Sequence, residues 1–224
     1  MTFQQLYTHF FTHIHMAIAP ARCNGCTSLL VSRAVLCVEC NQKIIPVLAT
    51  KLVITHTNVL PVFAAGAYQD VLKRLICAKH ARYQLAGTYL GELIWYRTPI
   101  ASMPVDYIVS IPLHWTRKLS RGFNQTEQMA LALSRMSGKP VASVLKRKKR
   151  TLFQTSLSAA DRLHNVANAF ELTNKAMHDT QYAGKHLVLV DDLMTTGATL
   201  RMACRQLIKL KPASIICVVA ARTV

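Results

Sequence analysis

The segment Leu187–Leu200 limits the possible folds more than any other part of the sequence. It opens with Leu187–Val190, a continuous apolar run, and such runs are typical of strands buried on both faces of a parallel sheet. Two acids, Asp191 and Asp192, follow the run directly, and the turn Thr195–Gly197 comes just before the next helical pattern. The segment therefore predicts a buried strand, a polar turn and a helix, which is a unit from which α/β folds are built.

The turn between this strand and this helix has the chemistry of a site for a phosphorylated sugar. Ligands of open α/β sheets bind at the carboxyl ends of strands, and a helix N-terminus presents free N–H groups and a positive dipole end to a phosphate. Gly197 lets the backbone approach a ligand closely, and Asp191 and Asp192 can accept hydrogen bonds from the 2- and 3-hydroxyls of a ribose. One loop can thus hold both ends of ribose 5-phosphate. The alternative interpretation is an acid pair at a helix entry followed by an ordinary turn.

Strand and helix patterns alternate along the chain from residue 62 onward. We expect strands at 62–66, 106–111, 141–145, 168–172, 186–190 and 214–221, and helices at 70–79, 85–96, 124–138 and 198–210. Asn124 is a good N-cap for the third of these helices, and Gly138 is a good C-terminal stop. Apolar strands separated by helices indicate a parallel sheet covered on both faces. The sequence therefore predicts a doubly wound α/β fold.

Four of the seven cysteines lie close together in two C-x-x-C pairs, at Cys23, Cys26, Cys37 and Cys40. Each pair supplies two thiolates at a spacing that suits a tetrahedral ion, so the pairs predict a structural zinc with four sulfur ligands. The alternatives are a thioredoxin-type redox pair or buried free thiols. The other three cysteines occupy apolar segments, and we expect them in the core: Cys77, Cys204 and Cys217.

The charge of the chain favours a polyanionic partner. Lys and Arg number 27 against 10 Asp and Glu, a net charge of +17, which suits nucleic acid, phosphorylated metabolites or an anionic membrane surface. No apolar run reaches the about 20 residues that span a bilayer, and the N-terminus lacks the basic start of a secretory signal. We therefore expect a cytoplasmic protein. Its predicted parts are an amphipathic helix at 1–17, a zinc module at 18–60 and an α/β domain at 61–224.

The order of these features, a four-cysteine module followed by the 187–200 motif, is similar to that of the ComF family. Intermediate segments resemble the same family, namely Tyr68–Lys79, Ile111–Arg117 and Arg121–Thr126, with Arg147, Arg150, Gln154, Arg162, Asn165 and Phe170. The resemblance extends from about Cys23 to the last residue. It implies a type I phosphoribosyltransferase fold that binds phosphoribosyl pyrophosphate.

The resemblance also assigns roles to individual residues. It implies that Asp191 and Asp192 hold the ribose hydroxyls, and that the 5-phosphate is held by Thr195, Thr196, Gly197, Ala198 and Thr199. The loop at the place where other members of the fold bind pyrophosphate carries His114, Arg117 and Arg121, with Mg²⁺ expected to bridge phosphate oxygens. The acceptor of any phosphoribosyl transfer is not implied.

The ComF resemblance implies a role in handling single-stranded DNA during natural transformation. Expected partners are other DNA-uptake or recombination proteins, with contact to the inner-membrane surface as a further expectation. An unbroken basic run suits phosphate-backbone contact in a loop beside the active site, and the alternative is a solvated loop; the run is Lys146, Arg147, Lys148, Lys149 and Arg150. Two other functions stay open, an active phosphoribosyltransferase in nucleobase salvage and a structural adaptor with a vestigial pocket.

Overall fold

A five-stranded sheet forms the centre of the protein. The computed structural model describes residues 21–30, 34–77, 83–112, 124–147 and 169–224. The strand order is β1-β2-β7-β6-β3, and every neighbouring pair is parallel except β1 with β2. The strands are β1 (Thr50–Val53), β2 (Val59–Ala67), β3 (Tyr107–Ser110), β6 (His186–Met194) and β7 (Ser214–Arg222).

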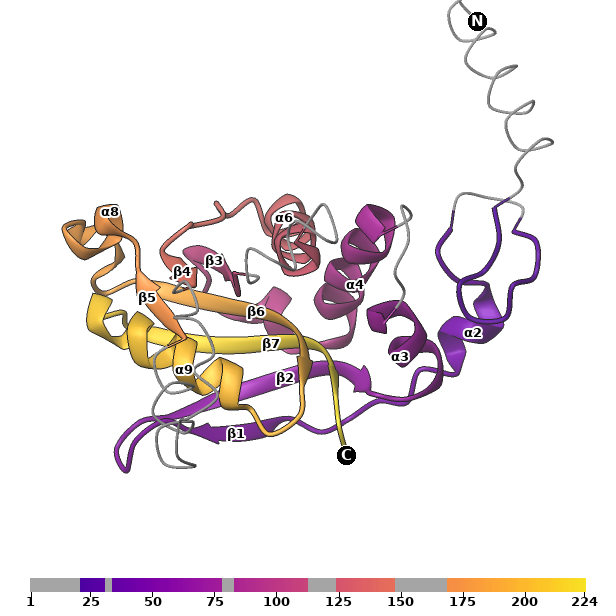
Figure 1. Cartoon of the computed structure of the whole chain (residues 1–224), viewed down its shortest axis with the longest axis horizontal. Helices are drawn as coiled ribbons and strands as arrows, with labels where there is room; N and C mark the ends of the chain where they lie inside the picture. The colour runs from indigo at the N-terminus through magenta and orange to yellow at the C-terminus, as the bar shows by residue number, and fades with distance from the viewer. Residues whose placement is uncertain (1–20, 31–33, 78–82, 113–123, 148–168) are drawn as a thin grey trace, which may run out of the picture.

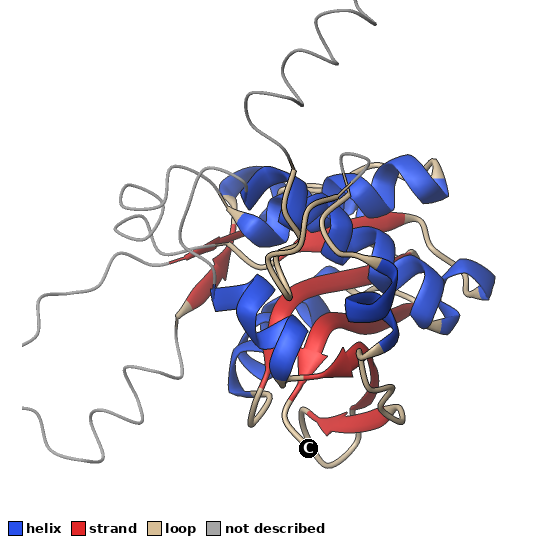
Figure 2. Ribbon diagram, turned by 90° about the vertical axis from the view of Figure 1, so that its right-hand side faces the viewer, coloured by secondary structure: helices blue, strands red, loops and turns tan. Residues whose placement is uncertain are grey.

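Helices cover both faces of this sheet (Figures 1 and 2). One face packs against α3 (Asp70–Cys77), α4 (Tyr83–Arg97) and α6 (Gln125–Ser137). The opposite face packs against α9 (Ala198–Leu207), α8 (Asn174–Met177) and a separate antiparallel pair, β4 (Leu145–Arg147) with β5 (Phe170–Leu172). The doubly wound, parallel-rich α/β fold expected from the sequence is confirmed.

The alternation of side chains along β6 explains the two cores. Val188 and Val190 are buried in the cluster on the α3 and α4 side, whereas Leu187 and Leu189 are buried in the cluster on the α9 side. Successive side chains of a strand point to opposite faces, so a strand covered on both faces has to be apolar at every position. The continuous apolar run in the sequence reflects this double burial.

The described residues also form several short elements. They are α2 (Val38–Gln42) and three 3₁₀ turns, η1 (Pro99–Ser102), η2 (Thr180–Tyr182) and η3 (Ile208–Leu210), the last of which continues α9. Among the residues that the structure describes, no helix is long and apolar enough to cross a membrane.

Two local expectations differ from the structure. The strand expected at 141–145 is reduced to a single bridge between Val141 and Ile108, and β4 begins only at Leu145, outside the main sheet. Asn124 lies at the N-cap position of α6, but its side chain makes no cap hydrogen bond. Its Nδ2 instead donates to the Ile111 carbonyl at 3.3 Å, because that backbone oxygen lies beside the helix start.

Candidate functional site: the carboxyl edge of the sheet and the four-cysteine cluster

The turn that follows β6 has the backbone expected of a phosphate-binding loop. Thr195 and Thr196 are exposed, and Gly197 is the N-cap of α9 with a left-handed φ of 73°. Ala198 and Thr199 form the first turn of the helix and are half-buried. The N–H groups of a first helical turn have no partner within the helix, so they and the exposed hydroxyls are available to an anion.

The two acids before this turn differ in their surroundings. Asp191 is only 6 % exposed, and its Oδ1 accepts a 2.9 Å hydrogen bond from the Asp192 backbone N–H. Burial raises the pKa of the Asp191 carboxyl well above its usual range, the Asp192 charge adds to this, and the positive charge of Arg147 opposes it. Asp192 is half-buried. The more accessible of the two carboxylates is therefore that of Asp192.

Two residues at this edge were not found by sequence reasoning, Tyr68 and Arg222. Tyr68 directly follows β2, and its backbone N–H donates to the Arg222 carbonyl at 2.8 Å. Its hydroxyl lies 3.1 Å from the Cys77 sulfur, and this hydrogen bond raises the pKa of Tyr68, to which burial and the Asp192 charge also contribute. The sequence signal that could have identified Tyr68 is its position directly after the apolar strand β2. Polar residues that follow parallel strands lie at the same edge of the sheet, here the edge that carries Asp192.

The residues expected to bind the diphosphate, His114, Arg117 and Arg121, lie outside the described part of the chain. The residues that flank this segment are described. The Ile111 N–H donates to the Val190 carbonyl at 3.0 Å, and the Ile111 carbonyl accepts from the Thr126 hydroxyl at 2.6 Å. Ile111 and Thr126 thus lie together at the carboxyl end of β3, beside the strand that carries Asp191.

The basic run is described only at Lys146 and Arg147, and both contact other side chains of the protein. The Lys146 Nζ lies 3.3 Å from a Glu171 carboxylate oxygen and donates to the Asn174 side chain at 3.2 Å. The Arg147 guanidinium lies 5.4 Å from the centroid of the Phe170 ring. Lys148, Lys149 and Arg150 lie outside the described residues. Nucleic-acid contact through the whole run stays a prediction.

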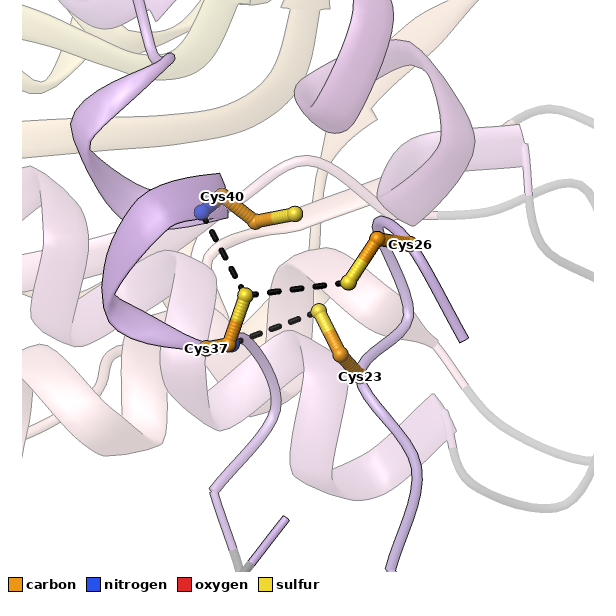
Figure 3. A group of neighbouring side chains, drawn as sticks. All are labelled: Cys23, Cys26, Cys37 and Cys40. Atoms are coloured by element: carbon orange, nitrogen blue, oxygen red, sulfur yellow. Dashed lines mark hydrogen bonds between the residues drawn. The ribbon is translucent and has the colours of Figure 1, made fainter. Parts of the chain in front are cut away.

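The four cysteines of the two C-x-x-C pairs come together in space, with their sulfur atoms within 4.8 Å of one another (Figure 3). The Sγ atoms of Cys26 and Cys37 are 3.7 Å apart, and a tetrahedral ion with metal–sulfur bonds of about 2.3 Å needs sulfurs about 3.8 Å apart. The backbone N–H groups of Gly25 and Cys37 each donate to the Cys23 sulfur at 3.3 Å. The cluster can hold a metal ion and fits a zinc module.

Acidity differs sharply within the cluster. Burial raises the pKa of Cys23, but the N–H groups that donate to its sulfur outweigh burial and bring the pKa to about 6. Burial and the neighbouring sulfurs raise the pKa of Cys40 to about 12. A negative charge on one sulfur therefore disfavours a charge on its neighbours, and a bound dication would offset this repulsion.

The cysteine cluster is fixed to the helices of the main sheet. Arg74 of α3 donates to the Gly25 carbonyl. Arg97 of α4 donates to the carbonyls of Ile44 and Asn41, and both of these Arg97 bonds are 3.0 Å long.

Of the three cysteines expected in the core, Cys204 and Cys217 are fully buried. The expectation for Cys77 was wrong, because α3 ends at this residue and leaves it exposed.

Comparison with known proteins agrees with the fold. Residues 108–223 match the family described as phosphoribosyl transferase domain, and the chain belongs to this family. A solved structure, the glutamine phosphoribosylpyrophosphate amidotransferase from B. subtilis, is similar at 16 % identity with a TM-score of 0.46, over 73 % of this chain and 32 % of that chain.

Two named relatives show which proteins with this domain the chain is similar to. It is 37 % identical to Competence protein F of Haemophilus influenzae over 123 residues, which are 54 % of this chain and 52 % of that protein. It is 34 % identical to the DNA utilization protein YhgH of Escherichia coli K12 over 126 residues, 56 % of this chain and 53 % of that protein. The resemblance to the ComF family is confirmed, and the chain spans about half the length of the curated relatives it matches.

Proposed function

We propose that the carboxyl edge of the sheet binds phosphoribosyl pyrophosphate or a related ribose phosphate. The observation that carries this proposal is the succession of Asp192, the exposed hydroxyls of Thr195 and Thr196, and the left-handed N-cap Gly197 at the start of α9. The Asp192 carboxylate would accept hydrogen bonds from ribose hydroxyls, and the N–H groups of the first turn of α9 would donate to the 5-phosphate. Mg²⁺ bound with the ligand would offset the charge of the diphosphate.

We propose zinc as the ion of the four-cysteine cluster. All four donors are sulfur, and soft thiolate ligands in a closed tetrahedral set favour zinc over hard cations. Four protein ligands leave no open position for a substrate. The ion would therefore be structural, and its contribution would be to hold the loop of residues 23–30 against α2.

We further propose that the chain acts in the handling of single-stranded DNA in the cytoplasm, as part of natural transformation or DNA use. The names of the relatives, Competence protein F and DNA utilization protein, support this role, as does the net charge of +17. Because Lys146 is paired within the β4–β5 sheet and with α8, the DNA contact would fall chiefly on Lys148–Arg150. Incubation with phosphoribosyl pyrophosphate and either DNA or nucleobases tests for phosphoribosyl transfer, because the transfer would release pyrophosphate.

Calorimetry with phosphoribosyl pyrophosphate tests the ribose site. Asp192→Asn should weaken binding by at least about tenfold, because it removes a charged acceptor of the ribose hydroxyls. Asp179→Asn is the matched control, since Asp179 is half-buried like Asp192, lies before β6 at the opposite end of the sheet, and accepts a hydrogen bond from the Gln181 backbone N–H that an Asn oxygen can also accept. The proposal fails if the wild type does not bind, or if Asp192→Asn binds as tightly as the control.

A further inference from the structure

Arg222 ends β7, the strand that adjoins β6 and the proposed phosphate loop, Thr195–Thr199. Its Cα partners across the sheet are Met194 of β6 and Ala67 of β2. The pairing continues one residue further, because the Thr223 N–H donates to the Met194 carbonyl at 3.0 Å. Figure 1 shows the last residues of the chain running beside the turn that leads from β6 to α9. Arg222 therefore lies level with the last residue of β6 before Thr195.

The guanidinium of Arg222 is poorly satisfied within the protein. Its Nη2 donates to the Leu48 carbonyl over a long 3.4 Å, and its buried Nε has no hydrogen-bond partner among the described residues. The described residues also include no carboxylate in an ion pair with it. A guanidinium has five N–H donors, and a buried donor without an acceptor is destabilising. An anionic ligand beside this side chain would remove that penalty.

The phosphate loop, in turn, lacks a cation of its own. No Lys or Arg occurs from Leu193 to Leu200, so within the loop a phosphate would meet only N–H and O–H donors. The first basic residue of α9, Arg201, already uses its Nε to donate to the Val53 carbonyl at 3.0 Å. Guanidinium groups bind phosphate through paired N–H donors, and Arg222 has donors available.

The strand segment that receives the Arg222 hydrogen bond also contacts the loop. Leu48 precedes β1, and Leu52 of β1 packs so close to Gly197 that a Cβ at Gly197 would lie 2.7 Å from the Leu52 Cδ1. The phosphate loop therefore lies close both to the segment of Leu48–Leu52 and to the end of β7. We propose that Arg222 binds the phosphate group of the ligand and supplies the positive charge that the loop lacks. This inference rests on the proposed ribose-phosphate site.

Titration calorimetry with ribose 5-phosphate tests the role of Arg222. Arg222→Gln should weaken binding about 10- to 100-fold, the range expected for the loss of charge-assisted hydrogen bonds. Arg222→Lys keeps the charge but not the planar fork, and should fall between Arg222→Gln and the wild type. Arg205→Gln is the matched control, because Arg205 is exposed on α9 and loses the same charge; it should bind like the wild type.

Melting temperatures of the same variants separate a ligand from a merely structural residue. If Arg222 only fixes Leu48, Arg222→Gln lowers the melting temperature but keeps the affinity for ribose 5-phosphate, and this result overturns the inference. If Arg222→Gln does not fold, the affinity of Arg222→Lys decides, and equality with the wild type overturns the inference. If the wild type binds neither ribose 5-phosphate nor phosphoribosyl pyrophosphate, the proposed ribose-phosphate site is refuted. If the wild type binds and the Arg222 variants bind equally well, only the role of Arg222 is refuted.

Discussion

Replacing Gly197 by Ala tests whether the phosphate loop is held in its backbone conformation by β1. Gly197 has a φ of 73°, and a non-glycine residue in this left-handed region costs about 1–2 kcal/mol. The new Cβ would also lie 2.7 Å from the Leu52 Cδ1 and 3.1 Å from the Met194 Cε. Leu52 is 2 % exposed and cannot move into solvent, so overpacking adds about 1–3 kcal/mol. We expect Gly197→Ala to destabilise the protein by about 2–5 kcal/mol.

Gly138→Ala is the matched control for the backbone part of this cost. Gly138 has a φ of 69°, close to that of Gly197, but a Cβ there has no neighbour within 4 Å. Its replacement should cost only the about 1–2 kcal/mol of the backbone strain. Urea unfolding followed by circular dichroism gives both free energies of unfolding, and the difference between the two variants isolates the contacts of the new Cβ with Leu52 and Met194.

A double-mutant cycle with Leu52→Ala completes the test. Leu52→Ala removes the Cδ1 atom that the new methyl group would meet, so Gly197→Ala in that background should cost less than in the wild type. The backbone strain and the 3.1 Å contact with the Met194 Cε remain. If Gly197→Ala and Gly138→Ala are equally destabilising, or if Leu52→Ala leaves the cost of Gly197→Ala unchanged, then Leu52 does not hold the backbone of this loop.

Two further predictions concern the metal and the DNA. Cys37→Ser should remove the bound zinc and lower the melting temperature on the order of 10 °C, because metal binding is part of the folding free energy. Cys77→Ser changes an exposed cysteine outside the cluster and should keep one zinc per chain. Metal analysis that finds no zinc in the wild type would contradict the zinc assignment. Replacing Lys148–Arg150 by Ala should reduce the slope of log affinity for single-stranded DNA against log salt by about 0.7 for each DNA phosphate that these side chains neutralise in the wild type. Lys146→Ala, which removes a paired lysine, should leave the slope unchanged, and equal slopes for both variants would count against DNA binding by this run.

The features that the sequence predicted well are those determined by neighbouring residues. The C-x-x-C spacing brings Cys23 and Cys26 onto one turn, and the apolar run before Asp191 follows from burial on both faces of β6. Gly138 ends α6 in the left-handed conformation expected of a C-terminal stop. Each of these signals is contained in a few consecutive residues, so each could be recognised without knowledge of the tertiary structure.

The features that the sequence did not predict depend on distant residues. β1 has four residues, only one of them buried, and it forms a strand because it pairs with β2. β4 leaves the main sheet because its partner is β5, more than 20 positions along the chain. Arg222 adjoins the phosphate loop only because β7 lies beside β6. Local patterns contain no information on which strands become neighbours.

The relation between the cysteine cluster and the main domain is also a tertiary property. The composition of the sequence suggested a separate module at 18–60, and this division stays a prediction. In the structure, Cys23 and Cys40 are buried in the same hydrophobic cluster as Leu72 of α3 and Leu90 of α4. That cluster also includes Val190, the residue before Asp191. A metal held by the cysteines would therefore stabilise the same core that supports the carboxyl edge of the sheet, although no cysteine of the cluster belongs to the proposed ribose-phosphate site.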